Sequence, residues 1–140
     1  MKSSIAVFLI VMAATAGCSK SAVKPVDIFP EDMCSHCRMS VSNQAFAAEI
    51  ITENGEALKF DDIGCMEEFT RNSKDVKMAG AFVKDYETKE WLPLEKSTII
   101  VTGIATPMGS GKIACGDSVR AAKIRSTFSA GNSAEKKKEQ

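Results

Sequence analysis

The sequence predicts an α+β protein with small antiparallel sheets and two helices. Two stretches, 45–60 and 78–94, each contain two β-rich runs on either side of a short polar turn. Two further segments, 63–72 and 118–128, carry apolar residues at spacings of three and four, which is typical of a helix. The two halves of the chain share this order of elements but almost no sequence identity. We therefore expect two small units of similar layout, with one helix each.

Residues 1–17 are predicted to be a signal peptide that does not belong to the fold. A lysine at position 2 precedes an almost entirely apolar run over residues 5–16, which is too short to span a bilayer. The segment ends in Thr15-Ala16-Gly17-Cys18, which resembles the box recognised by the bacterial lipoprotein peptidase, with ordinary cleavage nearby as the alternative. We therefore expect a lipid on Cys18 and a protein held at the periplasmic face of a bacterial membrane. Ser19 favours the outer membrane.

Length and charge limit the function of the mature chain. Removal of the signal peptide leaves 123 residues, enough for one compact domain or two very small ones. Loss of Lys2 leaves 17 basic and 18 acidic residues, a net charge of −1. This balance argues against nucleic acid as a partner, because phosphate recognition needs a clustered basic face. Residues 18–30 are predicted to be a lipidated tether, and the charged residues 130–140 a disordered tail.

The first unit, residues 31–77, is predicted to contain a hairpin and a helix. The Asn54-Gly55 pair is a strong turn signal between two β-rich runs. Asp61 or Asp62 then provides a cap for the helix. The predicted elements are a strand over 45–52, a strand over 57–60 and a helix over 63–72.

The second unit, residues 78–129, is predicted to be a reduced version of the first. A Glu87-Thr88-Lys89 turn separates two more β-rich runs, and a short β-branched strand follows them. Asp117 or Ser118 starts the second helix. The predicted elements are strands over 78–86, 90–94 and 98–103, a segment over 112–115, and a helix from 118 to about 128.

Residues 32–39 combine two thiols, the single histidine and two thioethers. Thiolate and thioether are soft donors, and together they favour Cu(I) over other biological ions. Cys37 and Met39 are separated by one residue, so in an extended segment both side chains lie on the same side. His36 could add a neutral imidazole nitrogen. Because the segment is too polar for a core strand, we predict that it forms one side of a copper site.

Cys34-x-x-Cys37 also has other interpretations. Four cysteines remain besides the lipidated one, and in an exported protein they predict two disulfides with three connectivities. A thiol oxidoreductase would carry such a pair at the start of a helix after a buried strand, but here Phe29-Pro30-Glu31-Asp32 precedes it. A zinc site could use Cys65 and Cys115, although these two lack the paired spacing of a zinc knuckle. A disulfide-stapled structural lipoprotein and an envelope thiol oxidoreductase are therefore the alternative functions.

Two further sulfur donors lie outside this stretch. Met108 stands on a loop that proline and glycines make rigid, away from any periodic apolar face, so we predict that it is another soft ligand. Cys65 lies near the predicted helix start, where a helix N-terminus would lower the pKa of its thiol. The Asp61-Asp62 pair is expected to cap that helix and not to bind a hard metal, because neighbouring side chains diverge.

The sequence holds no Ser-His-Asp set and no phosphate-binding glycine loop, so we predict that the protein is not an enzyme.

In these motifs the chain resembles the NosL family, copper-binding lipoproteins that accompany nitrous oxide reductase. The motifs appear in the family's order over roughly residues 18–128. They are the lipidated Cys18, Cys34-x-x-Cys37-x-Met39 followed by the AAEI strand, Phe60 to Met66 (FDDIGCM) and Thr106-Pro107-Met108-Gly109. Two features depart from the family pattern. Cys115 follows Ala114 where an aromatic residue is usual, and the chain is short after its second predicted helix.

The resemblance implies a fold, a ligand set and a partner. The fold would be two ββαβ-type units, and the cargo would be Cu(I) held by Cys, Met and His side chains. The partner would be nitrous oxide reductase or its assembly machinery, which receives copper for its cluster. The metal ligands implied in this chain are Cys34, His36, Cys37, Met39, Cys65 and Met108.

Overall fold

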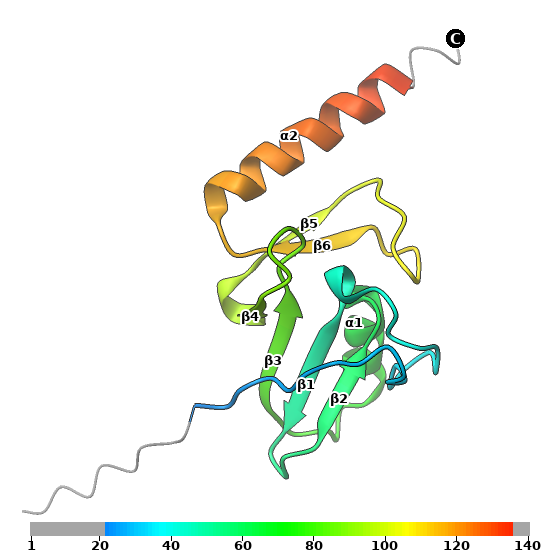
Figure 1. The fold of residues 1–140 in the computed structure, drawn as a ribbon, viewed down its shortest axis with the longest axis vertical. Helices are drawn as coiled ribbons and strands as arrows, with labels where there is room; N and C mark the ends of the chain where they lie inside the picture. Colours follow the sequence, from blue (N-terminus) through cyan, green and yellow to red (C-terminus); the bar gives the residue numbers. More distant parts are fainter. Residues whose placement is uncertain (1–21, 136–140) are drawn as a thin grey trace, which may run out of the picture.

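The computed structural model describes residues 22–135, so the predicted signal peptide and Cys18 lie outside the described residues. Within this range a four-stranded antiparallel sheet of order β2-β1-β3-β4 lies next to a two-stranded sheet, β5-β6 (Figure 1). Two helices accompany the sheets, which confirms the predicted α+β class. The elements are β1 (Ala48–Thr52), β2 (Ala57–Phe60), α1 (Ile63–Asn72), β3 (Met78–Lys84), β4 (Trp91–Pro93), β5 (Thr98–Val101), β6 (Lys112–Cys115) and α2 (Ser118–Glu135).

The hairpin of β1 and β2 forms at the predicted turn. Gly55 has a φ of +86°, a conformation that glycine adopts without a steric penalty. β2 has the predicted bounds, but β1 starts three residues later than expected. Residues 44–46 form a 3₁₀ turn instead, because the Asn43 side chain accepts a hydrogen bond from the amide of Ala45 and caps it.

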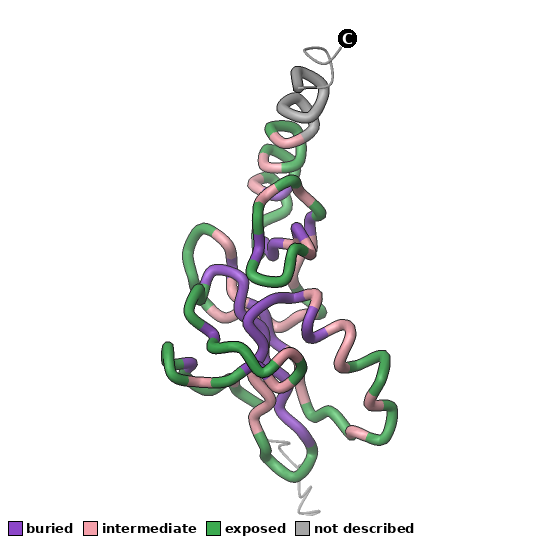
Figure 2. Tube along the Cα trace, turned by 90° about the vertical axis from the view of Figure 1, so that its right-hand side faces the viewer, coloured by how far each residue is buried: buried purple, intermediate pink, exposed green. Residues whose placement is uncertain are grey.

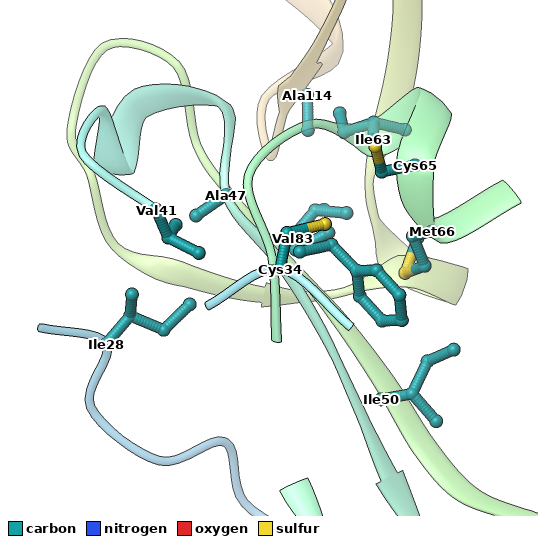
Figure 3. Close-up of a cluster of buried hydrophobic side chains, with 12 residues drawn as sticks. Ile28, Cys34, Val41, Ala47, Ile50, Ile63, Cys65, Met66, Val83 and Ala114 are labelled. Carbon is teal, nitrogen blue, oxygen red and sulfur yellow. The ribbon is translucent and has the colours of Figure 1, made fainter. Parts of the chain in front are cut away.

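Helix α1 also has its predicted bounds, and it covers one face of the first sheet. Asp62 is the N-cap, and its carboxylate accepts the Gly64 amide at 2.6 Å. Ile63 and Met66 point from the helix into the main core, to which Ile50 of β1 also belongs (Figure 3). The buried residues gather in the body of the protein, while the surrounding turns and most of residues 118–128 of α2 are exposed (Figure 2).

The strand β3 joins the first sheet. The sequence pattern assigns residues 78–86 to the second unit, but β3 pairs with β1 from Ala48↔Val83 to Thr52↔Met78. β4 then pairs with β3 and completes the sheet. The order β1-β2-α1-β3 is the ββαβ arrangement that the resemblance implies. The first unit therefore includes a strand from beyond its predicted boundary at residue 77.

The N-terminal segment, residues 22–30, lies along the face of the first sheet opposite α1 (Figure 1). Side chains alternate along β1, so Glu49 faces away from Ala48 and Ile50. Its carboxylate accepts the Val26 amide at 2.8 Å. The Gln44 amide donates to the Ile28 carbonyl at 2.7 Å, and the Ile28 side chain is buried in the main core. The described part of the predicted tether is thus attached to the body of the protein.

The second sheet has its own small core, linked to the first sheet by Asp85. Ile100 and Ile113 pack with Phe46 and with Ala121 of α2. Asp85 is buried at the end of β3, where it accepts the Gly116 amide at 2.9 Å and the Arg120 guanidinium at 2.8 Å. Burial alone would raise the pKa of Asp85, but these hydrogen bonds outweigh it and hold the pKa well below its usual range.

Helix α2 is longer than predicted. It continues to Glu135 and so includes residues 130–135 of the predicted tail, while residues 136–140 lie outside the described range. Only its first turns pack on the second sheet, and the rest projects from the body (Figure 1). Neither helix in the described range is long and apolar enough to cross a bilayer.

Candidate metal centre

Cys34 and Cys37 lie on a tight turn that is held against β2. The Cys34 amide donates to the Met39 carbonyl at 2.7 Å, and the Arg38 amide donates to the Cys34 carbonyl at 3.1 Å. Arg38 adopts a φ of +65°, which reverses the chain. The Ser35 amide donates to the carbonyl of Lys59 in β2 at 2.7 Å. The backbone thus fixes where both cysteines stand.

This turn separates Cys37 from Met39. The sequence interpretation assumed an extended segment with both side chains on one side, but residues 35–37 form a turn. The Cys37 thiol points inward and donates to the Asp61 carboxylate, with 3.6 Å from sulfur to each oxygen. The Met39 side chain is 55% exposed.

Asp61 and Cys65 come from the junction of β2 and α1. Phe60 ends the strand, Asp62 caps the helix, and the intervening Asp61 turns its carboxylate toward the cysteine turn. Cys65 lies in the first turn of α1 and faces the core close to Cys34 (Figure 3). The side chains of Asp61 and Cys65 are almost completely buried.

Four side chains therefore converge on one point. The thiol sulfurs of Cys34, Cys37 and Cys65 and a carboxylate oxygen of Asp61 all lie within 4.8 Å of one another. In the described part of the chain the cysteines at 34, 37, 65 and 115 are free thiols. Three sulfur donors at this spacing form a site for a soft metal ion.

The surroundings keep the two inner thiols protonated. Burial raises the pKa of the Cys34 thiol. Burial also raises the pKa of Cys65 strongly, and hydrogen bonding and the negative charge of Asp61 add to that increase. The prediction that the helix N-terminus would lower the pKa of Cys65 is therefore wrong, because desolvation outweighs the helix dipole. Such thiols are poor nucleophiles, which argues against the oxidoreductase alternative.

The remaining predicted ligands lie at the edge of this cluster. His36 and Met108 line a cleft of about 310 Å³ that also reaches Cys65. Lys112 forms an ion pair with Glu67 on the wall of this cleft. His36 is exposed, and Met108 is 45% exposed. The cleft thus joins two exposed donors to one buried thiol.

Asp62 holds the Met108 loop beside the start of α1. Its carboxylate accepts the Met108 amide at 3.2 Å as well as the Gly64 amide. Burial alone would raise the pKa of Asp62, but hydrogen bonds from Ser110, Thr106 and these amides outweigh it and lower the pKa. A carboxylate that stays charged in this position fixes the loop between the two sheets.

The sequence analysis missed Asp61 as a member of the cluster. It assigned Asp61 and Asp62 together to helix capping, yet a helix has one N-cap position and Asp62 occupies it. A second aspartate, placed between the strand that ends at the buried Phe60 and the N-cap of the helix, was the signal that could have revealed it. Cys115, considered as a zinc ligand, is buried in the second core, and its thiol donates to the Asp117 carbonyl at 3.3 Å.

Comparison with known proteins agrees with the layout of the site. The family model described as NosL matches residues 25–126, which include the cysteine turn, the β2–α1 junction and the Met108 loop. Searches of curated proteins and of solved structures gave no match. A family model that covers most of the chain and all of these site elements establishes the family. The chain belongs to the NosL family, a family of copper-binding accessory proteins.

Proposed function

We propose that this protein is a lipid-anchored periplasmic chaperone that carries Cu(I) to nitrous oxide reductase or its assembly machinery. The observation that carries the proposal is the convergence of three thiols, those of Cys34, Cys37 and Cys65, from two segments of the chain. Cu(I) binds readily with two or three sulfur ligands. Membership of the NosL family supports copper as the cargo.

Differences in exposure among the donors support a transfer role. Cys34 and Cys65 are buried, Cys37 is half-buried, and Met39 and Met108 are exposed. A partner can thus reach the ion through Cys37, the least buried of the three thiols, and replace one sulfur at a time. The protein needs no catalytic group for such an exchange.

The test is a competition titration of the reduced protein with Cu(I) and a chromophoric chelator. Cys34→Ser, Cys37→Ser and Cys65→Ser should each weaken Cu(I) binding by more than about 100-fold, beyond the range typical of residues outside the ligand set. Cys115→Ser is the matched control, because Cys115 is equally buried but lies in the second core. Cluster variants that bind like the control would overturn the site.

The methionines require a separate comparison. Met39→Leu and Met108→Leu remove the thioether while keeping an apolar side chain of similar size. Met33 and Met78 are exposed to nearly the same extent as Met39 and Met108, so Met33→Leu and Met78→Leu are matched controls. We expect the first pair to slow copper transfer to a competing chelator and the controls to leave the rate unchanged. Equal rates in all four variants would remove the methionines from the transfer route.

Anchoring and client are tested in cells. Cys18→Ala should release the protein from the membrane fraction and abolish its labelling by a fatty acid. A strain carrying Cys37→Ser should produce nitrous oxide reductase with less copper than a strain carrying Cys115→Ser. A fully loaded reductase in both strains would count against this client.

A further inference from the structure

We propose that Cys34, Cys37, Cys65 and Asp61 also form a complete tetrahedral site for a divalent ion of the Zn²⁺ type, and that Asp61 determines which metal the cluster retains. The inference shares its three thiols with the proposed copper site. It goes further by assigning a function to the carboxylate, which a Cu(I) site does not require.

The spacing of the four donors fits a tetrahedral ion. Zinc–sulfur bonds of about 2.3 Å place two tetrahedral sulfur ligands about 3.8 Å apart. The Cys37 sulfur lies 3.6 Å from each oxygen of Asp61, and all four donor atoms lie within 4.8 Å of one another. Small side-chain movements would therefore close the four donors around one ion.

The donor set suits a borderline divalent ion better than Cu(I). Carboxylate oxygen is a hard ligand that Zn²⁺ accepts alongside thiolate, whereas Cu(I) selects sulfur. With three thiolates and one carboxylate the site carries four negative charges. Zn²⁺ leaves a residual charge of two and Cu(I) leaves three. In a buried site the smaller residual charge is favoured.

The Asp61 carboxylate is also weakly satisfied by the protein itself. It is 1% exposed, and the hydrogen-bond donors that the described residues offer its oxygens are cysteine thiols, with the Cys37 sulfur 3.6 Å from each oxygen. A thiol is a weak donor, so a buried carboxylate whose partners are thiols is poorly compensated. A bound cation would supply the missing interaction.

The position of the site agrees with a closed, four-ligand centre. Cys34 and Cys37 come from the turn, while Asp61 and Cys65 come from the β2–α1 junction. Ligation by protein side chains alone, with three of the four ligands buried, is typical of zinc sites that stabilise a fold. An ion held in this way would link the cysteine turn to the start of α1 and so stabilise the fold. Copper loading would then displace the divalent ion and free the carboxylate.

The experiment titrates reduced metal-free protein with Zn²⁺ and, separately, with Cu(I). The variants are Asp61→Asn, which keeps the shape of the side chain and removes its charge, and Asp27→Asn as an exposed control. We expect Asp61→Asn to weaken Zn²⁺ binding by at least about 10-fold and to leave Cu(I) affinity within about 3-fold. Asp27→Asn should change neither affinity, and Cys65→Ser should weaken both.

X-ray absorption of the unmutated protein loaded with Zn²⁺ gives a second, independent answer. The expected coordination is three sulfurs at about 2.3 Å and one oxygen at about 2.0 Å. This measurement decides the matter if Asp61→Asn fails to fold. Sulfur-only coordination, Zn²⁺ affinity unchanged by Asp61→Asn, or equal losses for both metals would overturn the inference. Zn²⁺ binding with the expected coordination but without any Cu(I) binding would overturn the proposed function alone.

Discussion

At the scale of single residues, Glu49 is a carboxylate placed where charge is unfavourable. Its side chain is fully buried between β1 and the N-terminal segment. One oxygen accepts the Val26 amide, and the other has no hydrogen-bond partner among the described residues. Burial raises the pKa of Glu49, although the positive charges of Lys59 and Lys84 oppose this. The charged form is therefore less favourable in the folded protein than in the unfolded chain.

This pKa predicts how Glu49→Gln changes stability with pH. The contribution of Glu49 to stability is fully present below the unfolded pKa of 4.5 and is lost as the pH rises through the raised folded value. Glu49→Gln should therefore stabilise the protein at pH 7 by about 1 kcal/mol. Urea unfolding of both proteins across this pH range measures the difference, which should vanish in acid. Glu53→Gln, at an exposed position just after β1, is the control. A less stable Glu49→Gln at neutral pH would contradict the prediction.

Asp61 and Asp62 show how far residue-level prediction reaches. The sequence indicated a cap at one of these positions, and Asp62 is that cap. The rule that neighbouring side chains diverge was used to exclude a metal site made of both carboxylates. The same divergence sends Asp61 toward the thiols of Cys34 and Cys37. The rule that neighbouring side chains diverge was correct. Which groups the diverging Asp61 carboxylate meets depends on the tertiary fold, because the cysteine turn comes from another part of the chain.

At the scale of elements, the loop between β5 and β6 depends on two glycines with positive φ. Gly109 has a φ of +69° and Gly111 a φ of +65°. A methyl group added at Gly109 would meet open space, whereas at Gly111 it would lie 2.5 Å from the Thr102 carbonyl oxygen. The two positions share the conformational cost of a side chain but differ in steric conflict.

This pair separates backbone strain from steric conflict. Gly109→Ala should destabilise the protein by about 1 kcal/mol, the cost of a non-glycine residue in the left-handed region. Gly111→Ala should cost about 2 kcal/mol more, because either the added methyl group or the carbonyl must move. It should also displace Met108 from the cleft and accelerate copper loss. Urea unfolding and chelator competition measure the two effects. Equal stability of the two variants would show that the loop backbone moves away from the added methyl group at little cost in free energy.

Local patterns predicted individual elements better than their partners. The bounds of β2 and α1 agree with the sequence interpretation. The assignment of β3 to the second unit does not match its pairing, because a strand's own pattern does not specify its neighbour. The pattern of β3 fits a hairpin with β4, which exists, and says nothing of β1, which pairs on its other side. The length of α2 was missed because its later turns lack an apolar stripe.

At the scale of the whole molecule, the metal cluster belongs to only one of the two cores. Its ligands lie in the main core, which contains Cys34 and Cys65. The second core lies between β5, β6 and the first turns of α2, and Asp85 connects the two. A bound ion should therefore stabilise the molecule unevenly.

Hydrogen exchange and thermal unfolding test this unevenness. At a free metal concentration of 1,000 times the Kd, binding adds about 4 kcal/mol to the free energy of unfolding. Exchange of the backbone amides of Cys34 and Ser35 should slow markedly when copper is added, while amides in α2 should change little. Cys65→Ser should show neither effect. Equal protection throughout the chain would indicate that the two cores unfold as one unit.

If Cys18 carries the proposed lipid, the attachment of the N-terminal segment limits how far the protein can stand from a membrane. From an acylated Cys18 to Asp32, just before the cysteine turn, a free chain of 14 residues could extend about 50 Å. Because residues 22–30 lie along the sheet, only the link from Cys18 to Ala22 separates the lipid from the folded domain, and this link can extend to at most about 14 Å. The domain would then stay close to the bilayer surface and move along it in two dimensions. Copper exchange would be confined to partners that present their own sites at that surface, and release of the segment would extend the protein's reach more than threefold.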